Sequence, residues 1–230
     1  MTARRITLFG GHYGSGKTNI AVNYALHLKK TGFDTVVCDL DIVNPYFRTK
    51  DSKAELDEAG VRLIAPKFAN SNVDLPALPQ ELYGAVQNRS LHAVLDVGGD
   101  DRGALALGRY APYILEENDY DMLFVANFYR PLTPDAGSAL SVMREIEAAG
   151  GIPFTGIVNN SNLAEETTPE DVLRTVGKAD ELSRLSGLDV RMTCAERILA
   201  EELKGRIPDL FPLDLQKKYY EIHQVRMNRK

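Results

Sequence analysis

Hydrophobic positions along the chain follow two alternating patterns. Short, nearly continuous apolar runs are typical of strands that are buried on both faces of a sheet. They occur at residues 5–9, 33–38, 61–65, 93–97, 121–127, 154–158 and 188–192. Between them, apolar residues recur at helical spacing, so that Ile20, Tyr24 and Leu28, for example, would share one helix face. The alternation predicts a three-layer α/β fold, with a mostly parallel sheet of about seven strands and helices on both faces.

Capping residues and glycines mark the ends of the predicted helices. Thr133-Pro134-Asp135 and Thr168-Pro169-Glu170-Asp171 each combine a capping side chain, an early proline and an acid near the positive end of a helix. Further helices are predicted at residues 51–59, 104–116 and 198–203.

Two segments are not predicted to join the sheet. Residues 66–80 contain Pro66, Pro76 and Pro79, which predicts a loop, either over the edge of a site or as a surface connection. Residues 206–230 are expected to form a C-terminal tail or helix, and residues 217–230 within it are polar with aromatic insertions. No linker or repeat divides the chain, so we expect residues 1–230 to form a single domain.

The composition narrows the class of protein. With 44% hydrophobic and 26% charged residues, the chain matches a globular protein with a sizeable core. The net charge of −5 does not favour nucleic acid as a partner. No apolar run approaches the ~20 residues that a membrane span needs. Because Cys38 and Cys194 form no disulfide framework and the first strand leaves no room for a signal peptide, we expect a cytoplasmic protein.

One motif carries clear chemistry. The G-x-x-x-x-G-K-[ST] pattern of a phosphate-binding loop is matched by Gly11-His12-Tyr13-Gly14-Ser15-Gly16-Lys17-Thr18. The motif lies between a predicted strand and a predicted helix, the context that it requires. Glycines let successive backbone N–H groups turn toward an anion, Lys17 would reach the β- and γ-phosphates, and Thr18 would ligate Mg²⁺. We expect these residues and the adjoining Asn19 to bind a nucleotide, making the chain a P-loop nucleotide-binding domain.

Carboxylates follow two of the predicted strands. Asp39 and Asp41 come after the second strand, and Asp96 comes at the end of the apolar strand that begins at residue 93. Carboxyl ends of parallel strands meet at one edge of a sheet, where ligands bind. We therefore predict that Asp96 serves Mg²⁺ and that at least one of Asp39 and Asp41 faces the metal or the attacking water. The alternative for the latter pair is to cap a loop or to pair with Arg48. Gly99 has the spacing from Asp96 to bring its N–H to the γ-phosphate.

These stretches together resemble the MinD/ParA group of P-loop ATPases, in the SIMIBI class. The resemblance is carried by the phosphate loop, by Asp39-Leu40-Asp41 and by Asp96-Val97-Gly98-Gly99-Asp100, and it extends to Leu203. The stretch at residues 41–48 is similar to bacterial ATP-binding proteins of the CobQ/CobB/MinD/ParA nucleotide-binding domain family. The resemblance implies an ATPase switch that works as a homodimer or with a protein partner. By it, Asp41 would orient the attacking water, Asp96 would hold Mg²⁺ through water, and Gly99 would sense the γ-phosphate.

The sequence departs from this family in two places. His12 stands where the family usually has a signature lysine that reaches the partner's phosphates. Its imidazole either donates a weaker, pH-dependent hydrogen bond or is a plain loop residue, so either the dimer is modified or Arg48 or Arg102 supplies the charge. The nitrogenase iron protein of the same group shares an iron–sulfur cluster between subunits. Cys38 and Cys194 lack the spacing for such a cluster and are expected to be core residues.

The identity of the base rests on Asn159-Asn160-Ser161-Asn162. In guanine-specific P-loop proteins an N-K-x-D motif presents an acid where this chain has Asn162. The resemblance places Asn159 or Asn160 beside adenine, and the alternative is a cluster of turn residues. We therefore prefer ATP to GTP as the ligand.

Several functions share these motifs. The first hypothesis is a Mg-ATP-dependent hydrolase that acts as a nucleotide switch. A small-molecule kinase or a dethiobiotin-synthetase-like enzyme would need an acceptor pocket, which residues 66–80 with Tyr46-Phe47-Arg48 would build. A GTPase metallochaperone is opposed by the missing N-K-x-D motif and metal clusters, and a DNA-partitioning ATPase by the acidic balance of charge.

Overall fold

The computed structural model describes residues 3–40, 52–65, 80–99 and 101–215. Asp41, Arg48, Asp100, most of the expected loop at 66–80 and the end of the expected tail lie outside these residues. The described strands form one eight-stranded sheet with the order β3-β2-β4-β1-β5-β6-β7-β8, and every neighbouring pair is parallel. The strands are β1 (Ile6–Gly10), β2 (Thr35–Asp39), β3 (Arg62–Ile64), β4 (His92–Asp96), β5 (Tyr120–Ala126), β6 (Gly156–Asn159), β7 (Val190–Glu196) and β8 (Leu210–Leu213).

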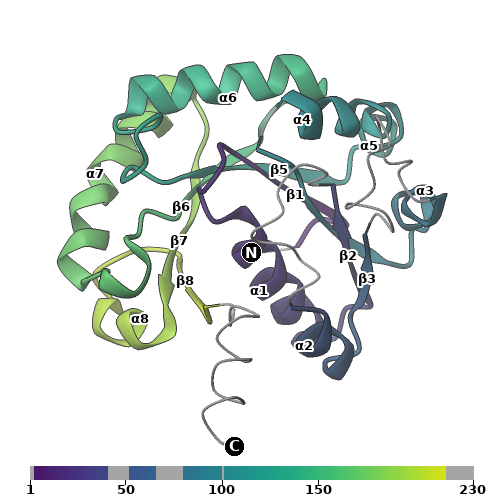
Figure 1. Ribbon diagram of the computed structural model, residues 1–230, viewed down its shortest axis with the longest axis horizontal. Helices are drawn as coiled ribbons and strands as arrows, with labels where there is room; N and C mark the ends of the chain where they lie inside the picture. The colour runs from purple at the N-terminus through teal and green to yellow at the C-terminus, as the bar shows by residue number, and fades with distance from the viewer. Residues whose placement is uncertain (1–2, 41–51, 66–79, 100, 216–230) are drawn as a thin grey trace, which may run out of the picture.

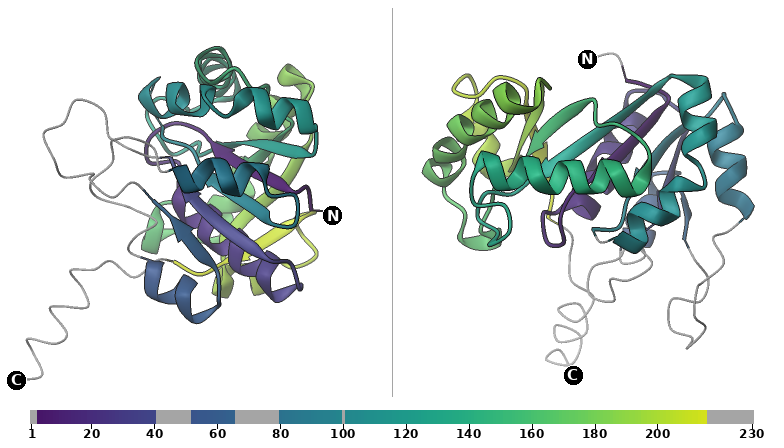
Figure 2. Two further views of the ribbon diagram at one scale, coloured as in Figure 1. Left: turned by 90° about the vertical axis from the view of Figure 1, so that its right-hand side faces the viewer. Right: turned by 90° about the horizontal axis from the view of Figure 1, so that it is seen from above.

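Helices cover both faces of the sheet, which confirms the three-layer prediction (Figure 1). They are α1 (Lys17–Lys30), α2 (Lys53–Glu58), α3 (Gln80–Gln87), α4 (Asp101–Gly108), α5 (Ala111–Glu117), α6 (Ala136–Gly150), α7 (Pro169–Ser186) and α8 (Arg197–Leu203), with a 3₁₀ turn at Ala164–Glu166. Helices α1 and α2 contribute to the core on one face, and α3 to α7 to the core on the other. Figure 2 shows these layers from two further directions.

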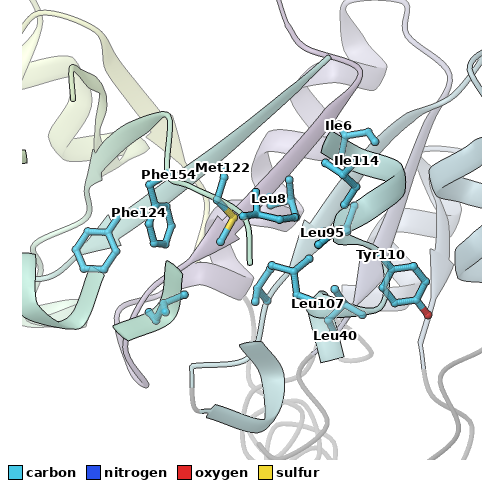
Figure 3. Close-up of a cluster of buried hydrophobic side chains, with 14 of the residues drawn as sticks. Ile6, Leu8, Leu40, Leu95, Leu107, Tyr110, Ile114, Met122, Phe124 and Phe154 are labelled. Carbon is cyan, nitrogen blue, oxygen red and sulfur yellow. The ribbon is translucent and has the colours of Figure 1, made fainter. Parts of the chain in front are cut away.

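The two cores arise because successive residues of the central strands point to opposite faces. Leu8 packs with the cluster under α4, α5 and α6, whereas its neighbour Phe9 packs under α1. In the same way, Leu95 and Val94 of β4 divide between the two clusters. Figure 3 shows part of the first cluster, where Leu8, Leu95, Leu107 and Tyr110 gather between the sheet and the helices. Strands that are apolar on both sides read as the continuous runs seen in the sequence.

The C-terminal edge of the sheet differs from the expectation. Residues 210–213, part of the expected tail or helix, form β8 and pair in parallel with β7. Pro212 lies within this strand and cannot donate a ladder hydrogen bond, so its sequence does not read as a strand. The strand is possible because β8 is the edge of the sheet, where one side of the backbone needs no partner.

Two further differences concern helices. The helix predicted at residues 104–116 is divided into α4 and α5, because Pro112 clashes with a continuous helix and instead occupies the first turn of α5. Helix α3 was not predicted, although Leu82, Ala85 and Val86 have helical spacing and are buried. None of the helices in the described part of the chain is both long and apolar enough to cross a membrane.

The predicted start of α7 holds in detail, whereas α6 begins later than predicted and has a different cap. Thr168 and Asp171 form a reciprocal capping box at α7, with Pro169 in its first turn. At α6 the cap is Asp135, whose carboxylate accepts from the backbone N–H of Ser138 at 2.8 Å. Thr133 instead folds back and donates to the backbone oxygen of Asn127, so it closes the preceding loop.

Candidate nucleotide-binding site

The candidate site lies at the carboxyl edge of the sheet, between β1, β4, β5 and β6. All strands are parallel, so every strand ends at the same edge and the loop after β1 meets the ends of its neighbours. In register, Phe9 of β1 lies beside Asp96 of β4, and Asp96 lies beside Asp39 of β2. The topology therefore brings the acidic strand ends to the side of the sheet from which the phosphate loop emerges.

Close contacts explain two glycines of the phosphate loop. A Cβ atom on Gly11 would lie 2.5 Å from the backbone oxygen of Val125, and one on Gly16 would lie 2.2 Å from Asn160 Nδ2. Gly16 also has a φ of 92°, which L side chains rarely adopt. Asn160 occupies the space beside Gly16 because its Nδ2 donates to the backbone oxygen of Ser15 at 2.7 Å. The end of β6 thus braces the loop directly.

Lys17 and Thr18 begin helix α1 at the end of this loop. Lys17 is buried, with 5% of its surface exposed, and its Nζ donates to the backbone oxygen of His12 at 3.2 Å. The hydroxyl of Thr18 donates to Asp96 Oδ2 at 2.6 Å, although the two residues are far apart in the sequence. The positive end of α1 therefore faces the same space as a lysine, a hydroxyl and a carboxylate, the arrangement that binds a metal–phosphate pair.

The donor set fits Mg²⁺. Asp96 and Asp39 are almost fully buried, at 1% and 3% exposed, and adjoin each other across the ladder. Buried carboxylates are costly unless they are paired, hydrogen-bonded or bound to a cation. Together with the Thr18 hydroxyl they are hard oxygen donors, which Mg²⁺ prefers. Within the described ranges, no group of three or more His, Cys, Asp or Glu side chains is arranged to hold a metal. The third predicted acid, Asp41, falls in the stretch that is not described.

Gly99 brings the segment after β4 onto the phosphate loop. A Cβ atom there would lie 2.7 Å from the backbone nitrogen of Tyr13 and 2.9 Å from Lys17 Nζ. Only glycine allows so close an approach, so the backbone of this segment reaches the space beside the loop lysine. The contact of Gly99 with a terminal phosphate stays a prediction.

A cavity of about 370 Å³ extends from the loop toward the ends of β6, β7 and β8. Its far wall is mostly apolar, and two acids, Glu165 and Glu196, also face it. An apolar wall beside polar groups suits a flat aromatic ligand. Its lining consists of Tyr13, Gly14, Gly16, Lys17, Thr18, Asn19, Arg130, Asn160, Asn162, Ala164, Glu165, Thr167, Val172, Cys194, Ala195, Glu196, Leu199, Leu213 and Leu215.

Strand β6 ends at Asn159 and is followed by Asn160 and Asn162, and these three asparagines make different contacts. Asn159 is fully buried and turns inward, where its Nδ2 donates to Thr175 and its Oδ1 accepts from Ser161. Asn160 lines the cavity and braces the loop. Asn162, at the position of the acid in guanine-specific motifs, accepts from the Ala164 N–H through Oδ1 and donates through Nδ2 to the Asn160 backbone. Of the two residues predicted beside the base, the structure places only Asn160 on the cavity.

Two other residues of the phosphate loop, His12 and Ser15, are not among the described residues that line the cavity. The ring nitrogen Nδ1 of His12 lies 3.0 Å from the backbone oxygen of Tyr13, and His12 is outside the cavity lining. Ser15 is buried.

Arg130, outside the loop motif, lines the cavity beside Gly14. Its position was not predicted, because no motif includes it; the available signal is that it follows the end of β5 at the ligand-binding edge.

Both cysteines are free thiols buried in the core, as expected. Burial raises the pKa of the Cys38 thiol to about 12, so it stays protonated at neutral pH. Burial also raises the pKa of Cys194. Cys194 contributes to the wall of the cavity as well, a position that the sequence did not predict.

Comparisons with known proteins identify the fold. No protein-family model matches the chain, and no curated protein matches it. A solved structure of the cell division protein FtsY from Thermotoga maritima aligns at 15% identity over 83% of this chain and 61% of that chain, with a TM-score of 0.56. FtsY from Mycoplasma mycoides aligns at 16% identity over 82% and 59%, with a TM-score of 0.54.

A third similar structure is the signal recognition particle 54 kDa protein from Aeropyrum pernix in complex with GDP. It aligns at 14% identity over 84% of this chain and 41% of that chain, with a TM-score of 0.51. This chain spans about three fifths of the FtsY chains that it matches. At these identities the likeness concerns the fold alone, which is that of the P-loop nucleoside triphosphatases.

Proposed function

We propose that this chain binds a Mg²⁺–nucleoside triphosphate in the cavity and hydrolyses it as a conformational switch. The observation that carries the proposal is the Thr18–Asp96 hydrogen bond of 2.6 Å at the start of α1, beside Lys17. It joins the two oxygen donors that a metal–phosphate site needs, from segments that only the fold brings together. The GDP complex of the A. pernix protein supports a nucleotide ligand for this fold.

Each residue has a role in this proposal. Backbone N–H groups of the loop and Lys17 bind the phosphates and stabilise the charge that develops during hydrolysis. Mg²⁺, held by the Thr18 hydroxyl and the Asp96 carboxylate, would supply charge neutralisation when bound. Asp39, which lies beside Asp96 in the sheet, would offer a second carboxylate to the metal or its water, and Asp41 would orient the attacking water, as the family resemblance implies.

Gly99 provides the switch. Its backbone N–H would donate to the γ-phosphate, and its close approach to Tyr13 couples it to the phosphate loop. Loss of the γ-phosphate removes that contact, so the segment between β4 and α4 is released after hydrolysis. The same coupling would control assembly of a homodimer or the binding of a partner protein.

For the base we propose adenine, so that the ligand is ATP. Asn162 uses both ends of its amide within the loop and offers no carboxylate to guanine. The alternative is GTP, which has two supports. The A. pernix structure holds GDP, and Glu165 and Glu196 at the cavity are carboxylates that could accept from guanine N–H groups.

The experiment measures turnover of Mg-ATP and Mg-GTP by the full chain, with Lys17→Ala as the blank, while light scattering follows the mass. ATP turnover with ATP-dependent dimerisation supports the proposal. Faster GTP turnover overturns the adenine assignment and leaves the switch intact. Turnover that starts only when a metabolite is added indicates the kinase alternative instead, and absence of turnover with either nucleotide contradicts the proposal.

A further inference from the structure

Within the described part of the chain, Arg130 lies beside the phosphate loop at Gly14. A Cβ atom on Gly14 would lie 3.5 Å from Arg130 Nε and 3.6 Å from Arg130 Cζ, so the guanidinium lies beside the loop at the position that a side chain of residue 14 would take. Arg130 and Gly14 also line the same cavity as Lys17. The guanidinium therefore faces the space in which the proposed phosphates would lie.

The segment that carries Arg130 is held firmly. After β5, Asn127 is buried and its Oδ1 accepts from the Tyr129 N–H, while the Arg130 N–H donates to the Asn127 backbone oxygen at 3.1 Å. Thr133 closes the turn by donating to the same oxygen, and the Phe128 N–H donates to the hydroxyl of Ser161 in the loop after β6. Because these hydrogen bonds fix the backbone of the turn, little further backbone entropy is lost when Arg130 binds a ligand.

The charged side chains that line the cavity indicate what Arg130 could bind there. Among the described lining residues the cationic side chains are Lys17 and Arg130, and the acidic ones are Glu165 and Glu196. The guanidinium of Arg130 makes no hydrogen bond or ion pair with any described side chain in this structure. By contrast, Arg4, Arg174 and Arg197 form ion pairs with acidic side chains at the surface. A planar guanidinium is the group best suited to bind a phosphate with two parallel hydrogen bonds.

We propose that Arg130 is a phosphate-binding residue, which donates from its guanidinium to the phosphates cradled by the loop at Gly14. The inference rests on the proposed nucleotide function and deepens it. Lys17 then approaches the phosphates from the start of α1, and Arg130 approaches them from the turn after β5. The nucleotide connects the ends of β1 and β5 through this pair of cations.

The test compares the affinities of the full chain and its variants for Mg-ATP, Mg-GTP, ADP and AMP by calorimetry, at low and high salt. The variants are Arg130→Ala and Arg130→Lys. Arg89→Ala is the matched control, because Arg89 is exposed in the turn before β4, at the opposite edge of the sheet. The melting temperature of each ligand-free variant is recorded, since Arg130 is exposed and its loss should leave the fold intact.

We expect Arg130→Ala to weaken triphosphate and diphosphate binding by about ten- to a hundredfold, the range for a hydrogen bond between charged groups. AMP affinity should change much less, Arg130→Lys should recover part of the loss, and Arg89→Ala should bind as wild type. The salt dependence of triphosphate binding should also decrease in Arg130→Ala.

Three outcomes overturn the inference. If wild type binds nucleotide and Arg130→Ala binds it equally well, Arg130 has no phosphate role and the proposed function stands. If AMP loses as much affinity as the triphosphate, Arg130 acts on the nucleoside or the α-phosphate and not on the phosphates held by the loop. If wild type takes up no Mg-nucleotide at all, the proposed function and this inference fail together.

Discussion

Gly16 and Asn160 share a space that has no room for another carbon atom. A methyl group on Gly16 would lie 2.2 Å from Asn160 Nδ2 and would strain a backbone with a φ of 92°. We therefore predict that Gly16→Ala reduces nucleotide affinity at least as strongly as Lys17→Ala. Calorimetric titration with Mg-ATP and Mg-GTP measures this, and Gly177→Ala serves as the control, because its Cβ would meet nothing within 4 Å. Unchanged affinity in Gly16→Ala would contradict the described loop.

The segment at Gly99 gives a second prediction at this scale. A side chain at Gly99 would meet the Tyr13 backbone and Lys17 Nζ, at 2.7 and 2.9 Å. Gly99→Ala should therefore slow turnover more than it weakens diphosphate binding, since the proposed contact is with the γ-phosphate. Steady-state turnover and ADP affinity are compared in the same variant. A variant with normal turnover would remove Gly99 from the proposed switch.

The sequence predicted the position of residues that belong to a contiguous motif, but not of residues that only the tertiary fold brings to the cavity. Lys17 and Thr18 follow from a motif of contiguous residues, so their position was predictable. Asn159 and Asn160 are adjacent and chemically identical, yet one is turned inward and the other faces the cavity. Arg130 reaches the cavity only through the closed turn after β5, which depends on Asn127 and Thr133. No spacing rule encodes that turn.

Among the elements, α7 is the helix whose start is best defined. Thr168 accepts from the Asp171 N–H and the Asp171 carboxylate accepts from the Thr168 N–H. We expect Thr168→Ala to lower the free energy of unfolding by about 1 kcal/mol, the usual loss for a removed cap. Urea denaturation measures the change, and Thr168→Ser, which keeps the hydroxyl, should lose much less. Equal losses in both variants would exclude the cap as the cause.

The ion pair of Asp214, the residue after β8, makes the stability of the protein depend on pH. Arg197 of α8 donates to both oxygens of Asp214, at 3.0 and 2.7 Å, and this hydrogen bonding lowers the pKa of the Asp214 carboxyl. A lowered folded pKa gives stability that is present above the ordinary aspartate pKa of about 3.9 and is lost as the pH falls through the folded value. Both side chains are about half exposed, so the effect is small.

Asp214→Asn should therefore be slightly less stable than wild type at neutral pH, and the difference should vanish under acidic conditions. Urea midpoints recorded across this pH range for both proteins provide the measurement. A difference that grows as the pH falls would contradict the assigned sign.

Boundaries of elements were predictable where a cap or glycine marks them. The sequence reading failed at Pro112, which divides one predicted helix into α4 and α5, and at Pro212, which hides an edge strand. Proline restricts the backbone in the same way in a loop, a helix start and an edge strand, and only the tertiary position decides among them.

At the scale of the whole molecule, two cores support the central strands. Leu8 of β1 is fully buried between β4 and β5, in the cluster on the α4–α6 face. Leu8→Ala should lower the free energy of unfolding by about 2–5 kcal/mol, because the site cannot collapse around the cavity. Leu185→Ala, at an exposed position on α7, is the control and should change it by less than about 0.5 kcal/mol. Similar losses in the two variants would contradict the described core.

The order of the strands in the sheet places the residues of the candidate site next to one another. Because β1 lies between β4 and β5, the phosphate loop adjoins the acid at the end of one neighbour and the arginine after the other. Alternation of strands and helices predicted a parallel sheet, but it did not predict this order, which depends on crossovers that no single stretch of sequence specifies. The site is therefore a property of the whole sheet and of the motif together.

The most direct test of the account is calorimetric binding of Mg-ATP and Mg-GTP to wild type, Lys17→Ala and Asp96→Asn, with and without Mg²⁺. The account predicts that wild type binds one of the two triphosphates and that Mg²⁺ strengthens this binding. Lys17→Ala should lose affinity, and Asp96→Asn should lose the dependence on Mg²⁺. Absence of uptake of either nucleotide by the folded wild-type protein, or an Asp96→Asn variant that still responds fully to Mg²⁺, would contradict it.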